Sequence, residues 1–194
     1  GVRIDRLEEA LGIYKSLWSD GKASAEGTHY TVTGAQGLPR PRSTPHPKIV
    51  IGGGGKRVLS LAGREADIIG VNPNLAAGYV GPEVAASAKA ELFRDRIQWI
   101  KDAAGDRFDS IELQCLNFMV SVTDDRDSVM NNMAPLFGMT REEIEEVPIG
   151  LVGTIDQICD TIQQRREEYG FSYFVWHEDE IEALAPVVER LAGT

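Results

Sequence analysis

Apolar residues recur along the chain with two different spacings, and these spacings predict the order of its helices and strands. From Ile4 to Trp18 they form the stripe of an amphipathic helix, which Gly21 can end. Later apolar runs are short and continuous, which is typical of strands buried on both faces of a parallel sheet. Helical patterns separate these runs, so the predicted fold class is α/β.

Four apolar runs predict the strands of this sheet. Their sequences are KIVI, DIIGV, IELQCLNFMV and SYFVW. Three of the four helices expected between or after them lie in RVLSLAGREA, AASAKAELFRDRIQWIKDAAG and EIEALAPVVERLAG. Before the first strand, THYTVTG alternates as a short strand and LPRPRSTPHPK can only be extended. Residues 124–148 indicate loop and short helix.

The helix expected after residue 153 has the clearest boundaries. Thr154 and Gln157, three residues apart, form a capping box at its start. Gly170 has the residue type that suits the position just beyond its end. A helix between Thr154 and Gly170 is therefore expected to separate the third and fourth predicted strands.

Composition and charge narrow the classes of partner. The chain has 194 residues, 42% of them hydrophobic, and a net charge of −10, which argues against nucleic acid or an anionic membrane as partner. No apolar run reaches membrane-spanning length and no signal-peptide pattern opens the chain, so a cytoplasmic location is expected. Cys115 and Cys159 have no metal or disulfide spacing and are expected to be core residues, and no metal site is predicted.

Four consecutive glycines, Gly52–Gly55, follow the strand KIVI and precede a helix. Glycine loses more backbone entropy on folding than any other residue, so such a run needs a reason. Arg57 and Val58 break the dinucleotide fingerprint, and Arg57 after Lys56 breaks the P-loop pattern. Free amides and the positive end of a helix at a glycine turn suit a phosphate. The alternative is a tight turn without ligand, for which one or two glycines suffice.

The segment around the glycines is basic although the protein is acidic. Residues 38–64 contain six cations and no acid: Arg40, Arg42, Lys48, Lys56, Arg57 and Arg64. These are either solvated loop charges or part of a local anion site, and the neighbouring glycines favour the anion site.

Three long segments also resemble a known family. They are RIDRLEEALGIYKSLWSDG, GTHYTVTGAQGLPRPRSTPHPKIVIGGGGKRVLSLAGREADIIGVNPN and GLVGTIDQICDTIQQRREEYGFSYFVW. In this order and spacing they resemble the luciferase-like monooxygenase superfamily, and within it the oxidoreductases that use the 8-hydroxy-5-deazaflavin coenzyme F-420. The resemblance implies a (β/α)8 TIM barrel that binds a flavin or deazaflavin at the C-terminal ends of its strands.

The resemblance also implies which residues contact the coenzyme. The family's phosphate-binding positions match residues at the glycine turn, and their immediate neighbours are included. One more position, at the end of the next strand, is similar to one that lines the coenzyme. Together, these positions are Gly53, Gly54, Gly55, Lys56, Arg57, Val58 and Asn72.

Family members are longer than this chain, which resembles their C-terminal half to two-thirds and supplies about four of the eight strands of a barrel. A single domain over residues 1–194 is expected, with a helix at 1–20, an extended insert at 21–48, and barrel strands and helices at 49–194. The strands KIVI and SYFVW would be unpaired edges. A homo-oligomer, or pairing with the missing N-terminal half, is therefore expected.

The function implied is that of an oxidoreductase in which a deazaflavin exchanges hydride with a small organic substrate. Two alternatives stay open: an FMN-dependent monooxygenase, and a non-catalytic half-barrel that binds phosphate. No catalytic residue can be assigned. The candidate is His177, which follows the last strand, where barrel active sites lie and where imidazole titrates near neutral pH. A solvated turn in HEDE is the favoured interpretation of this residue.

Overall fold

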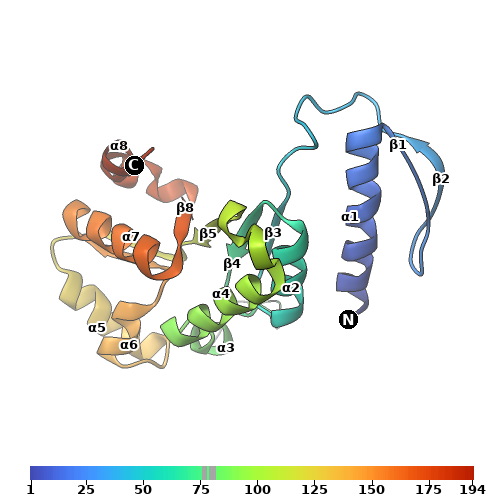
Figure 1. Cartoon of the computed structure of the whole chain (residues 1–194). Coiled ribbons are helices and arrows are strands. Elements are labelled where there is room, and N and C mark those ends of the chain that lie inside the picture. The colour runs from blue at the N-terminus through green and yellow to red at the C-terminus, as the bar shows by residue number, and fades with distance from the viewer. Residues whose placement is uncertain (76–77, 79–81) are drawn as a thin grey trace.

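The computed structural model describes residues 1–75, 78 and 82–194, and helices alternate with parallel strands along most of this length (Figure 1). The α-helices are α1 (Val2–Asp20), α2 (Lys56–Glu65), α3 (Pro82–Ala86), α4 (Ala90–Ala104), α5 (Arg126–Leu136), α6 (Arg141–Glu146), α7 (Ile155–Tyr169) and α8 (Ile181–Leu191). The strands are β1 (Lys22–Glu26), β2 (Thr31–Gln36), β3 (Val50–Gly53), β4 (Ile68–Val71), β5 (Glu112–Leu116), β6 (Met119–Val122), β7 (Gly150–Gly153) and β8 (Phe171–Val175). Two 3-10 turns complete the described elements: η1 (Gly105–Ser110) and η2 (Glu178–Glu180).

Four parallel strands form the central sheet in the order β3-β4-β5-β8. The α/β class and the parallel sheet are therefore confirmed. In this sheet β3 and β8 are the outer strands, so both predicted edges are edges within the described residues. β6 and β7 form a second, two-stranded parallel sheet.

The third predicted strand is two strands in the structure. β5 pairs with β8, and β6 pairs with β7, because the strand changes partner at Asn117. Asn117 N–H donates to the Val175 carbonyl at 2.7 Å, whereas Phe118 N–H donates to the Ile149 carbonyl at 3.1 Å. The prediction of one continuous strand was wrong at this point.

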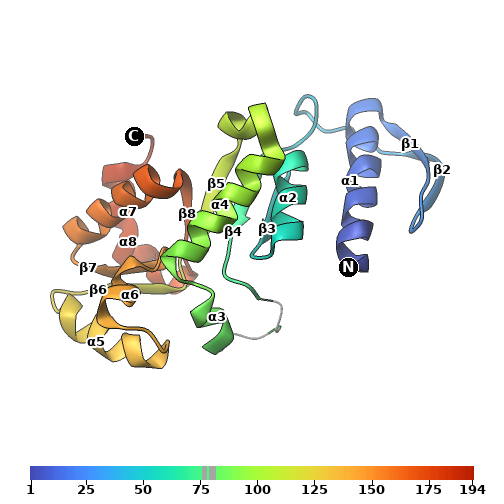
Figure 2. The ribbon, with the colours of Figure 1, turned by 60° about the horizontal axis from the view of Figure 1, so that its bottom comes forward.

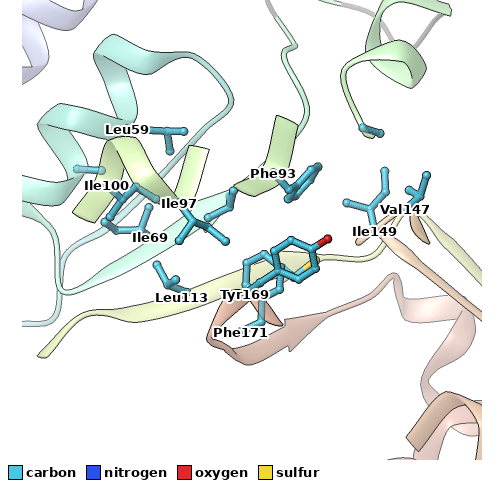
Figure 3. Close-up of a cluster of buried hydrophobic side chains, with 14 of the residues drawn as sticks. Leu59, Ile69, Phe93, Ile97, Ile100, Leu113, Val147, Ile149, Tyr169 and Phe171 are labelled. Carbon is cyan, nitrogen blue, oxygen red and sulfur yellow. The ribbon is translucent and has the colours of Figure 1, made fainter. Parts of the chain in front are cut away.

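One face of the central sheet packs against helices and forms the main core. Ile51, Ile69, Leu113 and Phe171 share a row across the four strands and are all buried. α2 and α4 lie side by side over the β3–β5 part of this face in both views (Figures 1 and 2). Figure 3 shows Leu59 from α2 and Ile97 and Ile100 from α4 over Ile69, with Phe93, Tyr169 and Phe171 gathered beyond them.

The opposite face of the sheet carries fewer covering elements. Its next row is Gly52, Gly70, Gln114 and Tyr173, in which two strands contribute no side chain. Tyr173, in this row, is 41% exposed. Val50, two residues before Gly52 on the same face of β3, is 55% exposed. In a closed barrel this face would be the interior.

α1 lies outside α2, and the β1–β2 hairpin lies beyond α1 (Figure 2). Three ion pairs join α1 to α2: Asp5 with Arg57, Glu8 with Arg64, and Lys15 with Glu65. The helix ends at Gly21 in the left-handed conformation, with φ 74°, as predicted. Residues 21–48 contain this antiparallel hairpin, whose first strand the sequence did not predict.

The helix boundaries that depend on capping signals are confirmed. Thr154 and Gln157 form the capping box of α7, and Gly170 ends that helix with φ 76°. The helix expected from about residue 85 begins at Ala90, because the chain turns between α3 and α4. Within residues 1–75, 78 and 82–194, no helix combines the length and apolar composition that a membrane span needs.

Candidate functional site

The glycine turn lies at the carboxyl edge of the sheet, where β3 ends and α2 begins. Gly53 pairs with Val71, and the Asn72 N–H donates to the Gly53 carbonyl at 2.9 Å, so the ends of β3 and β4 are held together. Gly55 is the N-cap of α2 and has an extended backbone, with φ −103° and ψ 148°. In open parallel sheets ligands bind outside this edge, where helix N-termini gather.

Packing within the protein explains two of the four glycines. A Cβ atom on Gly53 would collide with the Val58 side chain, and one on Gly54 would collide with the Pro73 carbonyl. By contrast, a Cβ on Gly55 would meet no heavy atom within 4 Å. The expectation that a ligand requires the bare backbone therefore applies to Gly55 and not to the whole run.

The first amides of α2 point out of the turn. The Leu59 N–H is the first to bond within this turn, to the Gly55 carbonyl at 3.1 Å. The N–H groups of Lys56, Arg57 and Val58 precede it and have no carbonyl of an earlier turn to bond. With the positive end of the helix dipole, they form a set of donors suited to an anion.

Arg96 of α4 reaches the turn from inside the protein. Its Nε donates to the Gly54 carbonyl at 3.0 Å, and its side chain is only 3% exposed. Burial lowers the pKa of Arg96 to about 10, an effect that the neighbouring Asp95 partly opposes. Sequence reasoning missed this residue, since nothing in a helix of mixed polarity marks one arginine as buried.

The basic residues near the turn do not gather around it. Arg57 turns to α1, where it pairs with Asp5 and donates to the Gly1 carbonyl at 3.3 Å. Lys48 lies 3.5 Å from Glu112, at 70% side-chain exposure. Lys56 is exposed and has no ion pair within the described part of the chain. Acids of α1 and β5 thus pair with charges that are close together in the sequence, so an anion at the turn would meet backbone amides more than this basic run.

Two asparagines mark the carboxyl edge of the sheet. Asn72 follows β4, and its Oδ1 is buried without a hydrogen-bond partner in the described residues. Asn117 follows β5, is fully buried, and donates from Nδ2 to the Val175 carbonyl at 3.2 Å. Its Oδ1 is likewise unpartnered among the described residues. Asn117 was not predicted, although a single amide inside the apolar run CLNFMV was a visible signal.

His177 lies at the same carboxyl edge of the sheet as the glycine turn, but it follows β8, the outer strand on the opposite side of the sheet from β3. It is exposed, and its ring meets the Phe118 ring at 6.3 Å between centroids. Its carbonyl accepts the Glu180 N–H at 3.2 Å, which closes the turn that begins η2. This geometry agrees with a solvated turn and brings no other predicted site residue to the imidazole.

The sequence matches one family model, and the fold matches that of several solved structures. The family model described as luciferase-like monooxygenase matches residues 2–169. No curated protein matches the sequence.

Solved structures with the same fold are longer than this chain. The coenzyme F-420-dependent tetrahydromethanopterin reductase from Methanopyrus kandleri superposes with a TM-score of 0.70 at 15% identity, over 97% of this chain and 63% of that one. A monooxygenase from Streptomyces bottropensis gives 0.66 at 15%, over 97% and 60%. An F-420-dependent secondary alcohol dehydrogenase, solved with an F-420–acetone adduct, gives 0.63 at 18%, over 98% and 62%. The chain therefore spans less than two thirds of each structure, and the likeness shows the fold.

Proposed function

Because the chain belongs to the luciferase-like monooxygenase family, we propose that it forms part of an oxidoreductase that binds the phosphate of a flavin-type coenzyme at the glycine turn. The coenzyme proposed is the deazaflavin F-420, and the substrate is a small organic molecule. The observation that carries the proposal is Gly55, a glycine that no packing contact requires, at the N-terminus of α2.

The residues at this edge fit such a group. The amides of the turn and of the first turn of α2 can donate to a phosphate, and the missing side chain of Gly55 lets it approach. The unpartnered Oδ1 of Asn72 can accept a hydrogen bond from a hydroxyl or N–H group of the coenzyme, and not from its phosphate. When bound, a deazaflavin or flavin supplies the hydride chemistry, while the protein binds and orients it.

Coenzyme F-420 and FMN are both named in the descriptions of the structural relatives. Two of them are F-420-dependent by name, and a riboflavin lyase was solved with modified FMN. FMN is therefore the alternative coenzyme. Titration calorimetry of the chain with each coenzyme separates the two, and tighter binding of FMN would replace deazaflavin in the proposal.

The proposal is tested by the variant Gly55→Val. Its extended backbone accepts any residue and its Cβ meets no atom, so the fold should survive while the side chain obstructs the phosphate. We expect the affinity for the coenzyme to fall at least about tenfold, which corresponds to roughly 1.4 kcal/mol. Gly54→Val is unsuitable, because it would displace the Pro73 backbone whether or not a ligand binds there.

The matched control is Gly12→Ala. Gly12 lies on α1, also has open space at its Cβ, and does not touch the turn. Coenzyme affinity should be the same in Gly12→Ala as in the wild type. If Gly55→Val also leaves it unchanged, the phosphate does not bind at this turn.

A further inference from the structure

We propose that Arg96 is the positioning residue of the phosphate site: it holds the Gly54 carbonyl inward and thereby turns the Gly55 N–H outward to the ligand. This inference rests on the proposed function. Arg96 lies 42 positions after Gly54 in the sequence.

The side chain of Arg96 is buried in an unusual setting. Its guanidinium lies 5.0 Å from the centre of the Phe93 ring, and its Nη1 is buried without a hydrogen-bond partner among the described residues. Within the same residues it has no carboxylate at ion-pair distance. A buried cation without such a partner is costly, so contacts elsewhere must compensate for it. The Gly54 carbonyl supplies one, and an anion at the turn would supply a second.

Peptide geometry links Arg96 to the outward face of the turn. In a planar trans peptide the C=O and the following N–H point in opposite directions. Since the Gly54 carbonyl points inward to Arg96, the Gly55 N–H points away from the protein interior. This N–H has no hydrogen-bond partner within the described residues, and the space beside Gly55 is open. It thus joins the amides of α2 as one more donor.

The arrangement gives Arg96 two effects on an anion. Rotation of the 54–55 peptide would replace a donor at the site with a carbonyl oxygen, which repels phosphate, and the bond from Arg96 opposes that rotation. Its buried charge also acts through a medium that solvent screens little.

The test compares Arg96→Met and Arg96→Gln, with inorganic phosphate as the probe. Methionine removes both the donor and the charge, whereas the glutamine Nε2 lies as many bonds from the backbone as the arginine Nε and can still donate to Gly54. We expect calorimetry to show phosphate affinity at least about tenfold lower in R96M, and an affinity between those of R96M and wild type in R96Q, which keeps the donor and loses the charge. In ¹⁵N-labelled protein, phosphate should shift the Gly55 amide resonance in wild type and R96Q, and not in R96M.

Arg165 provides the matched control. It is also 3% exposed, and it donates to the Glu145 carbonyl at 3.1 Å on another side of the core. R165M should keep the phosphate affinity of the wild type when both are measured below their melting temperatures. A merely structural role for Arg96 predicts instead that R96M and R165M behave alike.

The outcomes separate this inference from the proposed function. If the wild type binds phosphate and R96M binds it equally well, the positioning role is overturned and the site stands. If the wild type binds neither phosphate nor coenzyme, both are overturned. A Gly55 resonance that phosphate leaves unchanged in the wild type overturns the positioning role, even if R96M fails to fold.

Discussion

The four glycines of the turn differ in what requires them. Gly53 and Gly54 are required by the approach of Val58 and Pro73, which are parts of the protein itself. Gly55 is not, since its backbone and its surroundings would accept a side chain. A run of identical residues therefore combines positions that packing restricts with one, Gly55, at which no contact among the described residues requires a glycine.

This difference predicts the behaviour of Gly55→Asp. A carboxylate at the N-cap accepts hydrogen bonds from the first amides of α2 and interacts favourably with the helix dipole. We expect the free protein to become more stable, by a few tenths of a kcal/mol or more, and to lose phosphate binding, because the carboxylate occupies the same donors. Thermal melts with and without phosphate measure both effects. A variant that is stabilised by phosphate as strongly as the wild type would contradict this account.

At the scale of elements, the β1–β2 hairpin is fastened to α1 by one side chain. The Glu9 carboxylate accepts backbone N–H groups from His29, Thr28 and Tyr30 at 2.9, 3.0 and 3.1 Å. A Cβ on Gly27 would collide with this carboxylate, so the glycine lets the hairpin come close. These bonds, with that from His29 first, hold the pKa of Glu9 below its ordinary value.

The lowered pKa of Glu9 predicts an acid-sensitive hairpin. Because the folded-state pKa is depressed, the attachment is fully present above the ordinary glutamate pKa of about 4.3 and is lost as the pH falls through the folded-state value. In Glu9→Gln the amide has one acceptor oxygen in place of two. Hydrogen-exchange protection of Thr28, His29 and Tyr30 should therefore be lower in the variant at neutral pH and should change less on acidification.

Glu8→Gln is the control for this prediction. Glu8 lies on the same helix but pairs with Arg64 of α2 at 2.9 Å. Its loss should leave protection of the hairpin amides unchanged. Equal protection in Glu9→Gln and in the wild type would show that other contacts hold the hairpin.

At the scale of the whole molecule, the central sheet is open at β3 and β8 within the described residues. Beside β8, a groove of about 440 Å³ is lined mostly by apolar side chains from β8, the residue after it, α7 and α8, among them Tyr173, Trp176 and Leu191. The related structures are longer, and the chain covers 63% of the reductase. Unpaired strand edges with apolar flanks promote association with other strands.

We therefore expect the purified 194-residue chain to self-associate as its concentration rises, unless further strands of the fold are supplied. Tyr173→Lys should weaken the association, because a charge on an edge strand opposes strand pairing. Val2→Lys is the control, since Val2 is 56% exposed on α1 and lies away from the sheet. Light scattering over a range of concentrations measures the self-association of the wild type and of both variants. A folded monomer at every concentration would mean that these edges need no partner.

The sequence by itself determined the features that depend on neighbouring residues. Gly21, Gly170 and the Thr154–Gln157 capping box act within a few positions, so the C-terminal end of α1 and both bounds of α7 could be predicted. Short continuous apolar runs likewise predicted the parallel strands. The family resemblance is confirmed over residues 2–169, while the coenzyme and its contacts stay predictions.

Only the tertiary structure decided what depends on distant contacts. β7 is a strand because β6 pairs with it, although its glycines give it little tendency to extend. Arg57 turns from the glycines to Asp5 because α1 packs along α2. Arg96 contacts the glycine turn although 42 positions separate it from Gly54. Local signals predict backbone conformation because their hydrogen bonds close within one turn, whereas the partner of a buried charge depends on which helices the sheet brings together.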